Sequence, residues 1–191
     1  MKIISVINNF LPNGSELQWY MKPDTALLRN NDAFYLPGQM GRIVAEPQIA
    51  VRISRLAKCI DERFASRCYD SAHVAVNFTA DDILAGLISK GLPWEAAVGF
   101  DHSTAISNNT VGSEALIEGA VFAADATETL RLDPSQMRFS VDLIVCRLSH
   151  AMTLRIGDLI LLGSPARFDA KVGNNYRMTM GGETLLDFDI K

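Results

Sequence analysis

One apolar stretch, Ile43 to Ile53, limits the fold of this 191-residue chain more than any other segment. In an extended strand successive side chains alternate faces, so Glu46 and Gln48 point to the same side. Pro47 between them has no backbone N–H, which predicts a sheet edge or a bulge at this point. The stretch therefore predicts a largely buried strand that carries two polar side chains on one face.

A second apolar run, residues 72–76, predicts another buried strand and ends at Asn77. Thr79 and Asp82 fit the capping-box pattern, which predicts a helix just after Asn77 with Thr79 as its N-cap, and Gly91 ends it. Asn77 is thus expected just outside a helix N-terminus, where oxygen ligands and anions are often found.

Short strands and a few helices are expected along the rest of the chain. Strand candidates are residues 1–7, 19–21, 25–28, 33–36, 115–124, 138–147, 159–162, 177–180 and 185–190, with a short helix at 61–69. No internal repeat or linker is present, so we expect a single domain, 1–191, of the α+β class.

Composition excludes several classes of protein. A formal net charge of -4 argues against general nucleic-acid binding, which usually needs a basic face. The chain has no apolar run long enough for a transmembrane helix, and its first residues do not resemble a signal peptide. Cys59, Cys68 and Cys146 are widely spaced and form no CxxC, which favours a reducing, cytoplasmic location without disulfides or zinc.

Several short motifs follow one another in a recognisable order. They are residues 22–28, 46–53, 77–82, 91–95 and 99–101, then Arg155-Ile156-Gly157-Asp158-Leu159-Ile160 leading into Gly163-Ser164-Pro165. In this order and spacing the chain resembles the fumarylacetoacetate hydrolase family over nearly its whole length. The last motif is a variant of the family's Gly-Asp-x-Ile-x-x-Gly-Thr-Pro.

The resemblance implies a β-rich mixed fold, a homodimer and a pocket for Mg²⁺ or a similar divalent cation. Such enzymes hydrolyse or decarboxylate small β-dicarbonyl acids such as acylpyruvates. The metal binds the keto-acid oxygens and stabilises the enolate that C–C cleavage leaves.

The family's metal ligands, a Glu-x-Glu pair and an aspartate, fall on Glu46, Gln48 and Asn77. Only Glu46 keeps the carboxylate. Without the other two carboxylates, a divalent cation would leave excess positive charge in the pocket. We therefore expect no Mg²⁺ or Mn²⁺, or only weakly bound metal.

The other functional positions have also changed. The lid histidine falls on Asn13, which cannot act as a base near neutral pH, although its partner glutamate is retained as Glu16. The family's lysine falls on Val98, and an arginine at the start of the helix falls on Asp81. Lys22 and Ser164 remain as candidate substrate-binding residues at the pocket rim.

Three functional hypotheses follow from these replacements. The first is a family member with a degenerate metal and catalytic site that keeps a pocket for a small keto acid or carboxylate, with weak or no catalysis. The second is a functional metal-dependent hydrolase or decarboxylase that cleaves a C–C bond in substrates resembling acylpyruvate or oxaloacetate. The third is a purely structural dimer.

Overall fold

A computed structural model describes residues 1–11 and 16–191 of the chain. Its strands are β1 (Ile3–Val6), β2 (Trp19–Lys22), β3 (Leu27–Leu28), β4 (Ile43–Ile53), β5 (Tyr69–Ala80), β6 (Thr104–Ile106), β7 (Val111–Gly112), β8 (Ala120–Ala124), β9 (Thr127–Leu132), β10 (Leu159–Leu161), β11 (Phe168–Asp169), β12 (Asn175–Met180) and β13 (Glu183–Asp189). The α-helices are α1 (Asp81–Ser89), α2 (Glu95–Val98) and α3 (Val141–Ala151). Short 3₁₀ helices span Asp24–Ala26, Gly38–Met40, Glu62–Arg67, Ser113–Ile117 and Pro134–Gln136.

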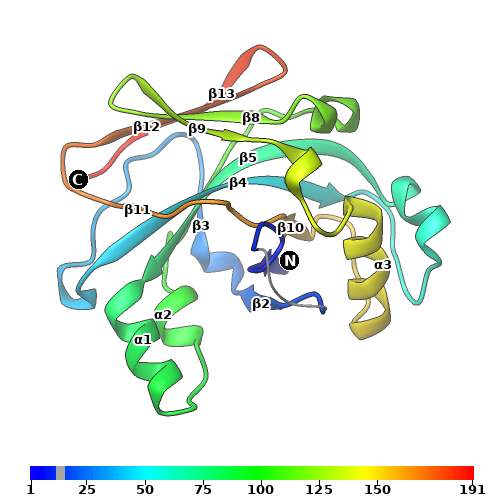
Figure 1. The fold of residues 1–191 in the computed structure, drawn as a ribbon, viewed down its shortest axis with the longest axis horizontal. Helices are drawn as coiled ribbons and strands as arrows, with labels where there is room; N and C mark the ends of the chain where they lie inside the picture. Colours follow the sequence, from blue (N-terminus) through cyan, green and yellow to red (C-terminus); the bar gives the residue numbers. More distant parts are fainter. Residues whose placement is uncertain (12–15) are drawn as a thin grey trace.

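Two sheets make up most of the described fold. The larger follows the order β2-β1-β10-β4-β5-β6-β3, with β11 beside β4 and β7 beside β5. The smaller has the order β13-β12-β8-β9 and lies across β4 and β5 (Figure 1). Parallel pairs, such as β1 with β10, occur beside antiparallel ones. Mixed sheets with few helices confirm the predicted α+β class.

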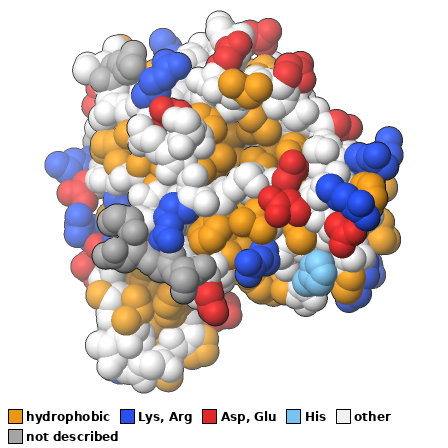
Figure 2. Space-filling model, turned by 45° about the vertical axis from the view of Figure 1, so that its right-hand side comes forward, with side chains coloured by type: hydrophobic (Ala, Val, Ile, Leu, Met, Phe, Trp, Pro, Cys, Tyr) orange, Lys and Arg blue, Asp and Glu red, His pale blue; other side chains and the backbone are white. Residues whose placement is uncertain are grey.

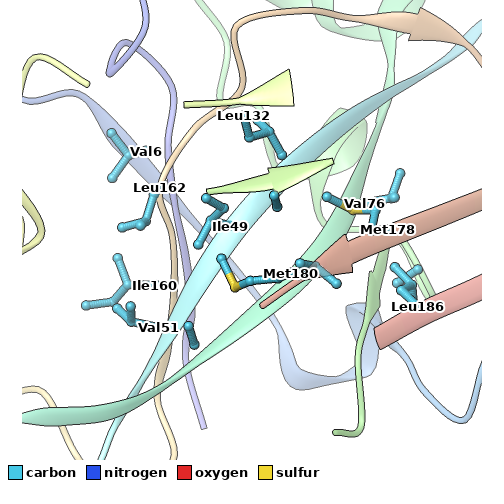
Figure 3. Packing of buried hydrophobic residues seen from close by; sticks show 14 of the residues in the cluster. Val6, Ile49, Val51, Val76, Leu132, Ile160, Leu162, Met178, Met180 and Leu186 are labelled. Carbon is cyan, nitrogen blue, oxygen red and sulfur yellow. The ribbon is translucent and has the colours of Figure 1, made fainter. Parts of the chain in front are cut away.

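The main hydrophobic core lies between the two sheets. Ile49 and Val51 of β4 and Val76 of β5 point toward Met178 and Met180 of β12 (Figure 3). The alternate residues of β4 and β5 point to the opposite face, where a second, smaller apolar cluster is buried. Since both faces of these strands are covered, β4 reads as a nearly continuous apolar run, and polar side chains within it need partners.

Pro47 lies inside the sheet, in a local gap between two partner strands. On the side of β4 away from β5, β11 pairs with Val44 and Ala45, and β10 pairs with Ala50 to Arg52. Pro47 has the same orientation as Ile49, whose carbonyl oxygen accepts from the N–H of Leu162 on that side. The missing N–H of Pro47 therefore faces the one stretch where no described strand pairs with β4, so the predicted edge is local.

Residues 138–147, predicted as a strand, instead lead into helix α3. Ser140 is its N-cap, and its side-chain oxygen accepts from the N–H of Leu143 at 3.1 Å. Ile144 and Leu148 of α3 are buried in the main core. The prediction was wrong because the apolar run, rich in Val, Leu and Ile, outweighed the capping serine and the acidic first turn, which are helix-start signals.

Two of the helix predictions also need correction. Thr79 belongs to β5, and the N-cap of α1 is Ala80, which makes no side-chain capping bond. Asp82 instead accepts a hydrogen bond from the N–H of Arg42 at 3.0 Å. The helix predicted at 61–69 is a 3₁₀ helix, Glu62–Arg67, followed directly by β5.

The surface carries charges of both signs. On the face shown in Figure 2, Lys and Arg side chains alternate with Asp and Glu around hydrophobic areas. Among the described residues, no helix is long and apolar enough to span a bilayer. The expectation that the chain binds neither nucleic acid nor membranes stays a prediction.

His73 on β5 is fully buried and neutral. Its Nδ1 lies 3.0 Å from the carbonyl oxygen of Ser107, while Nε2 has no hydrogen-bond partner within the described residues. Burial, opposed by the Ser107 hydrogen bond and aided by the nearby charge of Arg52, lowers the pKa of His73 to about 4. Protonation of this side chain therefore favours the unfolded chain, in which histidine keeps its ordinary pKa.

We expect the free energy of unfolding to be about 2 kcal/mol lower at pH 5 than at pH 7, because only the unfolded chain binds a proton at His73 in this range. The loss begins as the pH falls through about 6.5 and continues to about 4. Urea unfolding at both pH values measures it. His73→Gln should remove most of the difference, whereas His150→Gln, at an exposed position, should keep it. A wild-type stability that does not change over this range would contradict the assignment.

Candidate active site

A pocket of about 510 Å³ lies at one end of β4 and β5, beside α1 and α2. Its wall is largely apolar, and its polar side chains gather near β4. The lining residues are Ile7, Asn8, Leu11, Tyr20, Glu46, Thr79, Leu84, Ile88, Trp94, Val98, Ser164, Pro165, Ala166 and Arg167. Two other hollows of about 500 and 520 Å³ contain none of the predicted site residues. The chemistry predicted from the sequence therefore points to this pocket.

Of the three positions that the family pattern assigns to metal ligands, Glu46 and Asn77 lie side by side. The two residues are direct partners in the β4–β5 ladder, and Asn77 Nδ2 lies 3.1 Å from Glu46 Oε2. Gln48 shares the face of Glu46 but is buried, and its Oε1 accepts from the N–H of Gly163 at 3.0 Å. Gln48 thus holds the loop beside the pocket, while Glu46 faces the cavity.

The Asn77 amide can take only one orientation. Glu46 is paired with an arginine and only accepts hydrogen bonds, so the Asn77 atom that faces it is the donor nitrogen. The carbonyl oxygen Oδ1 then faces Lys22 Nζ, at 2.7 Å. Asn77 Nδ2 also donates to the hydroxyl of Tyr20 at 2.8 Å. A single amide therefore connects an amine, a carboxylate and a phenol.

Lys22 lies behind the pocket wall rather than at the predicted rim. It is 3% exposed, and besides Asn77 its Nζ donates to the carbonyl oxygen of Ser103 at 2.6 Å. Burial lowers the pKa of Lys22 well below its usual range, although the negative charge of Glu46 opposes this. Its position supports Asn77 and keeps it away from a ligand in the cavity.

Arg167 brings a positive charge to the pocket. Its Nε lies 3.1 Å from Glu46 Oε1, and its Nη2 donates to Asp81 Oδ1 at 2.7 Å. Asp81 also accepts from Arg42 Nη1, at 3.0 Å. Arg167 is about half exposed, so both carboxylates orient it while part of its guanidinium still faces the pocket.

The loop that carries Arg167 leaves the sheet opposite Pro47. Gly163 begins it with a φ of +94°, and a Cβ there would lie 3.1 Å from the carbonyl oxygen of Val6. Only glycine accepts this conformation without strain. Ser164 lies in the pocket lining as predicted, and its hydroxyl donates to the carbonyl oxygen of Ala166 at 2.7 Å.

The other predicted positions are less closely tied to the pocket. Val98 is buried and contributes to its apolar wall. Glu16 is exposed and is not among the described residues that line the cavity. Asn13 lies outside the described residues. The functional roles assigned to these side chains stay predictions.

The donors do not fit a hard divalent cation. Mg²⁺ and Mn²⁺ need oxygen ligands, usually with one or two carboxylates. Here the Asn77 oxygen faces Lys22, and one oxygen of Glu46 is held by Arg167. A cation between Glu46 and Asn77 would meet an N–H and leave its charge largely uncompensated. Within 1–11 and 16–191, no three His, Cys, Asp or Glu residues are grouped as metal ligands.

A largely apolar pocket with a carboxylate, a guanidinium and hydroxyl groups at one end is typical of proteins that bind or transform small molecules. The family model for the fumarylacetoacetate hydrolase C-terminal domain matches residues 7–186. The chain therefore belongs to the fumarylacetoacetate hydrolase family, which confirms the resemblance seen in the sequence.

Relatives and solved structures cover the whole chain. A mitochondrial oxaloacetate tautomerase of Arabidopsis thaliana is 27% identical over 208 residues, 100% of this chain and 91% of that protein. A putative fumarylacetoacetate hydrolase family protein of Yersinia pestis has a TM-score of 0.91 at 24% identity, covering 100% and 93%. Fumarylpyruvate hydrolase of Pseudomonas aeruginosa, solved with Mn²⁺ and pyruvate, has a TM-score of 0.90 at 21% identity, covering 100% and 89%.

Two pocket residues were missed in the sequence. Tyr20 lies two positions before Lys22 in β2, so strand alternation alone would have placed both side chains on one face. Arg167 gave no such signal, because it lies in the irregular segment between β10 and β11. Its contacts with Glu46 and Asp81 depend on the tertiary fold.

We expect the double variant Gln48→Glu, Asn77→Asp to gain Mn²⁺ binding that the wild type lacks. A carboxylate in place of the Asn77 amide would keep the contact with Lys22 and replace the N–H facing Glu46 by an oxygen. Thermal unfolding with and without Mn²⁺ measures the gain as a shift in Tm. Gln18→Glu, Asn108→Asp makes the same change of charge at exposed positions and should show no shift. Micromolar Mn²⁺ binding by the wild type in calorimetry would contradict the assignment.

Proposed function

We propose that the pocket binds a small 2-oxo carboxylic acid and that the chain catalyses its keto–enol tautomerisation without a tightly bound divalent metal. The observation that carries this proposal is Glu46, a carboxylate on the pocket wall held between Arg167 and the Asn77 N–H. A base next to a guanidinium in a largely apolar cavity suits the removal of a proton from an anionic ligand.

Arg167 is the proposed binding group for the ligand's carboxylate. Two of its five N–H bonds point to Glu46 and Asp81, and guanidinium pairs well with carboxylates through the others. The apolar wall, including Trp94 and Val98, makes the surroundings of a bound ligand less polar and so strengthens this contact.

Glu46 is the proposed base. It takes a proton from C3 of the ligand, the electron pair of that C–H bond becomes the C2–C3 double bond, and the carbonyl oxygen at C2 takes up a proton. The same groups run the reaction in reverse. No C–C bond breaks and no water attacks, so the reaction does not need the lid histidine whose position is Asn13.

The relatives favour an active enzyme. The sequence predicted weak or no catalysis, but the Arabidopsis relative is named as an oxaloacetate tautomerase. Compared with C–C bond hydrolysis or decarboxylation, tautomerisation depends least on a metal, because it only moves a proton from carbon to oxygen. The name and the observed donor set are therefore compatible with each other.

A second candidate is metal-dependent cleavage of a C–C bond in substrates such as acylpyruvate or oxaloacetate. The structure of the Pseudomonas hydrolase with Mn²⁺ and pyruvate favours it. For this chain it requires the Asn77 amide to turn and Arg167 to leave Glu46, with loss of both contacts.

Exchange of the pyruvate methyl protons in D₂O, followed by NMR in the presence of EDTA, tests the proposal. We expect the wild type to catalyse exchange, Glu46→Gln to lose about 10²-fold or more in rate, and Arg167→Gln to raise KM at least tenfold. Arg155→Gln, at an exposed position, is the matched control and should behave as wild type.

Other outcomes separate the two candidates. Oxaloacetate decarboxylation that appears only after Mn²⁺ is added would favour the second candidate. Pyruvate exchange that appears only after Mn²⁺ is added would contradict the metal-free part of the first. If neither occurs with or without metal, both candidates are wrong. The homodimer and the cytoplasmic location stay predictions, and light scattering tests the first.

A further inference from the structure

We propose that Tyr20 is a catalytic residue, which donates its phenol hydrogen to the carbonyl oxygen of the bound 2-oxo acid and protonates the enolate that Glu46 creates. This inference rests on the proposed function, which assigns a base but no general acid, and identifies Tyr20 as that general acid. None of the positions predicted from the family pattern supplies such a group, because the lid histidine and the lysine fall on Asn13 and Val98.

The position of Tyr20 suits a proton donor. It lies on β2 and lines the pocket together with Glu46 and Thr79. Its hydroxyl and Glu46 Oε2 share one hydrogen-bond donor, Asn77 Nδ2, at 2.8 and 3.1 Å. The acid and the base therefore lie on the same wall, on either side of one nitrogen.

The phenol hydrogen of Tyr20 takes no part in the contact with Asn77. Asn77 Nδ2 is itself a donor, so the phenol oxygen must accept that bond and its own hydrogen points elsewhere. Ser5 lies directly opposite Tyr20 in the β1–β2 ladder, and the hydroxyls of Ser5 and Thr79 lie close enough to the phenol to lower its pKa against the effect of burial. Thr79 lines the pocket together with Tyr20, so the phenol and a neighbouring hydroxyl both face a bound ligand.

The surroundings keep Tyr20 protonated until it is needed. Burial, aided by the negative charge of Glu46, raises the pKa of Tyr20 to about 12. At neutral pH the phenol is thus a hydrogen-bond donor. Lys22 polarises the Asn77 amide from behind, which strengthens the N–H that would hold the phenolate oxygen.

Glu46 and Tyr20 together account for both proton transfers, so no other reagent is needed. In the forward direction Glu46 gains the C3 proton and Tyr20 gives its proton to the C2 oxygen. Solvent exchange at the pocket mouth then returns Glu46 to the carboxylate and Tyr20 to the phenol. Arg167, at the carboxylate end of the ligand, supplies the positive charge that stabilises the developing enolate. A metal cation does not fit between Glu46 and Asn77.

Tyr20→Phe tests the assignment, with Tyr35→Phe, at a 70% exposed position, as the matched control. We expect Tyr20→Phe to lower kcat for pyruvate proton exchange about 10²-fold or more while KM changes less than threefold. Its affinity for oxalate, which mimics the enolate, should fall at least tenfold, and its affinity for acetate should stay within twofold. If the role of Tyr20 were purely structural, kcat would not fall without a change in KM, and the affinity for oxalate would not fall relative to that for acetate.

A second measurement does not depend on how well Tyr20→Phe folds. Replacing all tyrosines by 3-fluorotyrosine keeps the ring but makes the phenol more acidic, so the upper pH limit of exchange should move down. Wild-type exchange kinetics and oxalate affinity in folded Tyr20→Phe, or an unmoved pH limit in the fluorinated protein, would overturn the assignment and leave the proposed function standing. Wild type that neither exchanges pyruvate nor binds oxalate would overturn the proposed function itself.

Discussion

The hydrogen bond from the Asn77 amide to Glu46 is the constraint around which the whole pocket is arranged. With two carboxylates at these positions, only a cation or a proton could lie between them. An amide removes that need, because its N–H binds Glu46 directly while its oxygen binds Lys22. Arg167 can then pair with the other oxygen of Glu46, and Tyr20 can accept the second N–H.

The loop that borders the pocket leaves the sheet opposite Pro47, where β4 has no described partner strand on that side. The missing N–H of Pro47 leaves one stretch of β4 unpaired between β10 and β11, and the chain between these two strands leaves the sheet there. Gly163 makes the turn, and its N–H donates to Gln48 Oε1, so Gln48 holds the loop. The loop that leaves the sheet at this unpaired stretch of β4 thus forms one wall of the pocket.

Local sequence patterns predicted much of the fold correctly. They did not predict the features that depend on contacts between distant parts of the chain. The alternation in β4 placed Glu46 and Gln48 on one face, as observed, and the order of motifs gave the family. The helix α3 was read as a strand because its buried face is rich in branched residues. Arg167 and the burial of Lys22 could not be read from the chain, because both depend on partners far away in sequence.

The chain of contacts from Arg42 through Asp81 and Arg167 to Glu46 also bears on how such a site can evolve. In the family pattern an arginine occupies the position of Asp81, so the positive charge has moved from the helix to the loop. Reversing Asn77 alone would set a carboxylate against Glu46 with nothing between them, and reversing Asp81 alone would place a third arginine beside Arg42 and Arg167. Each of these two changes places like charges together, so we expect each to lower stability by itself and the site to change toward that pattern only through several substitutions at once.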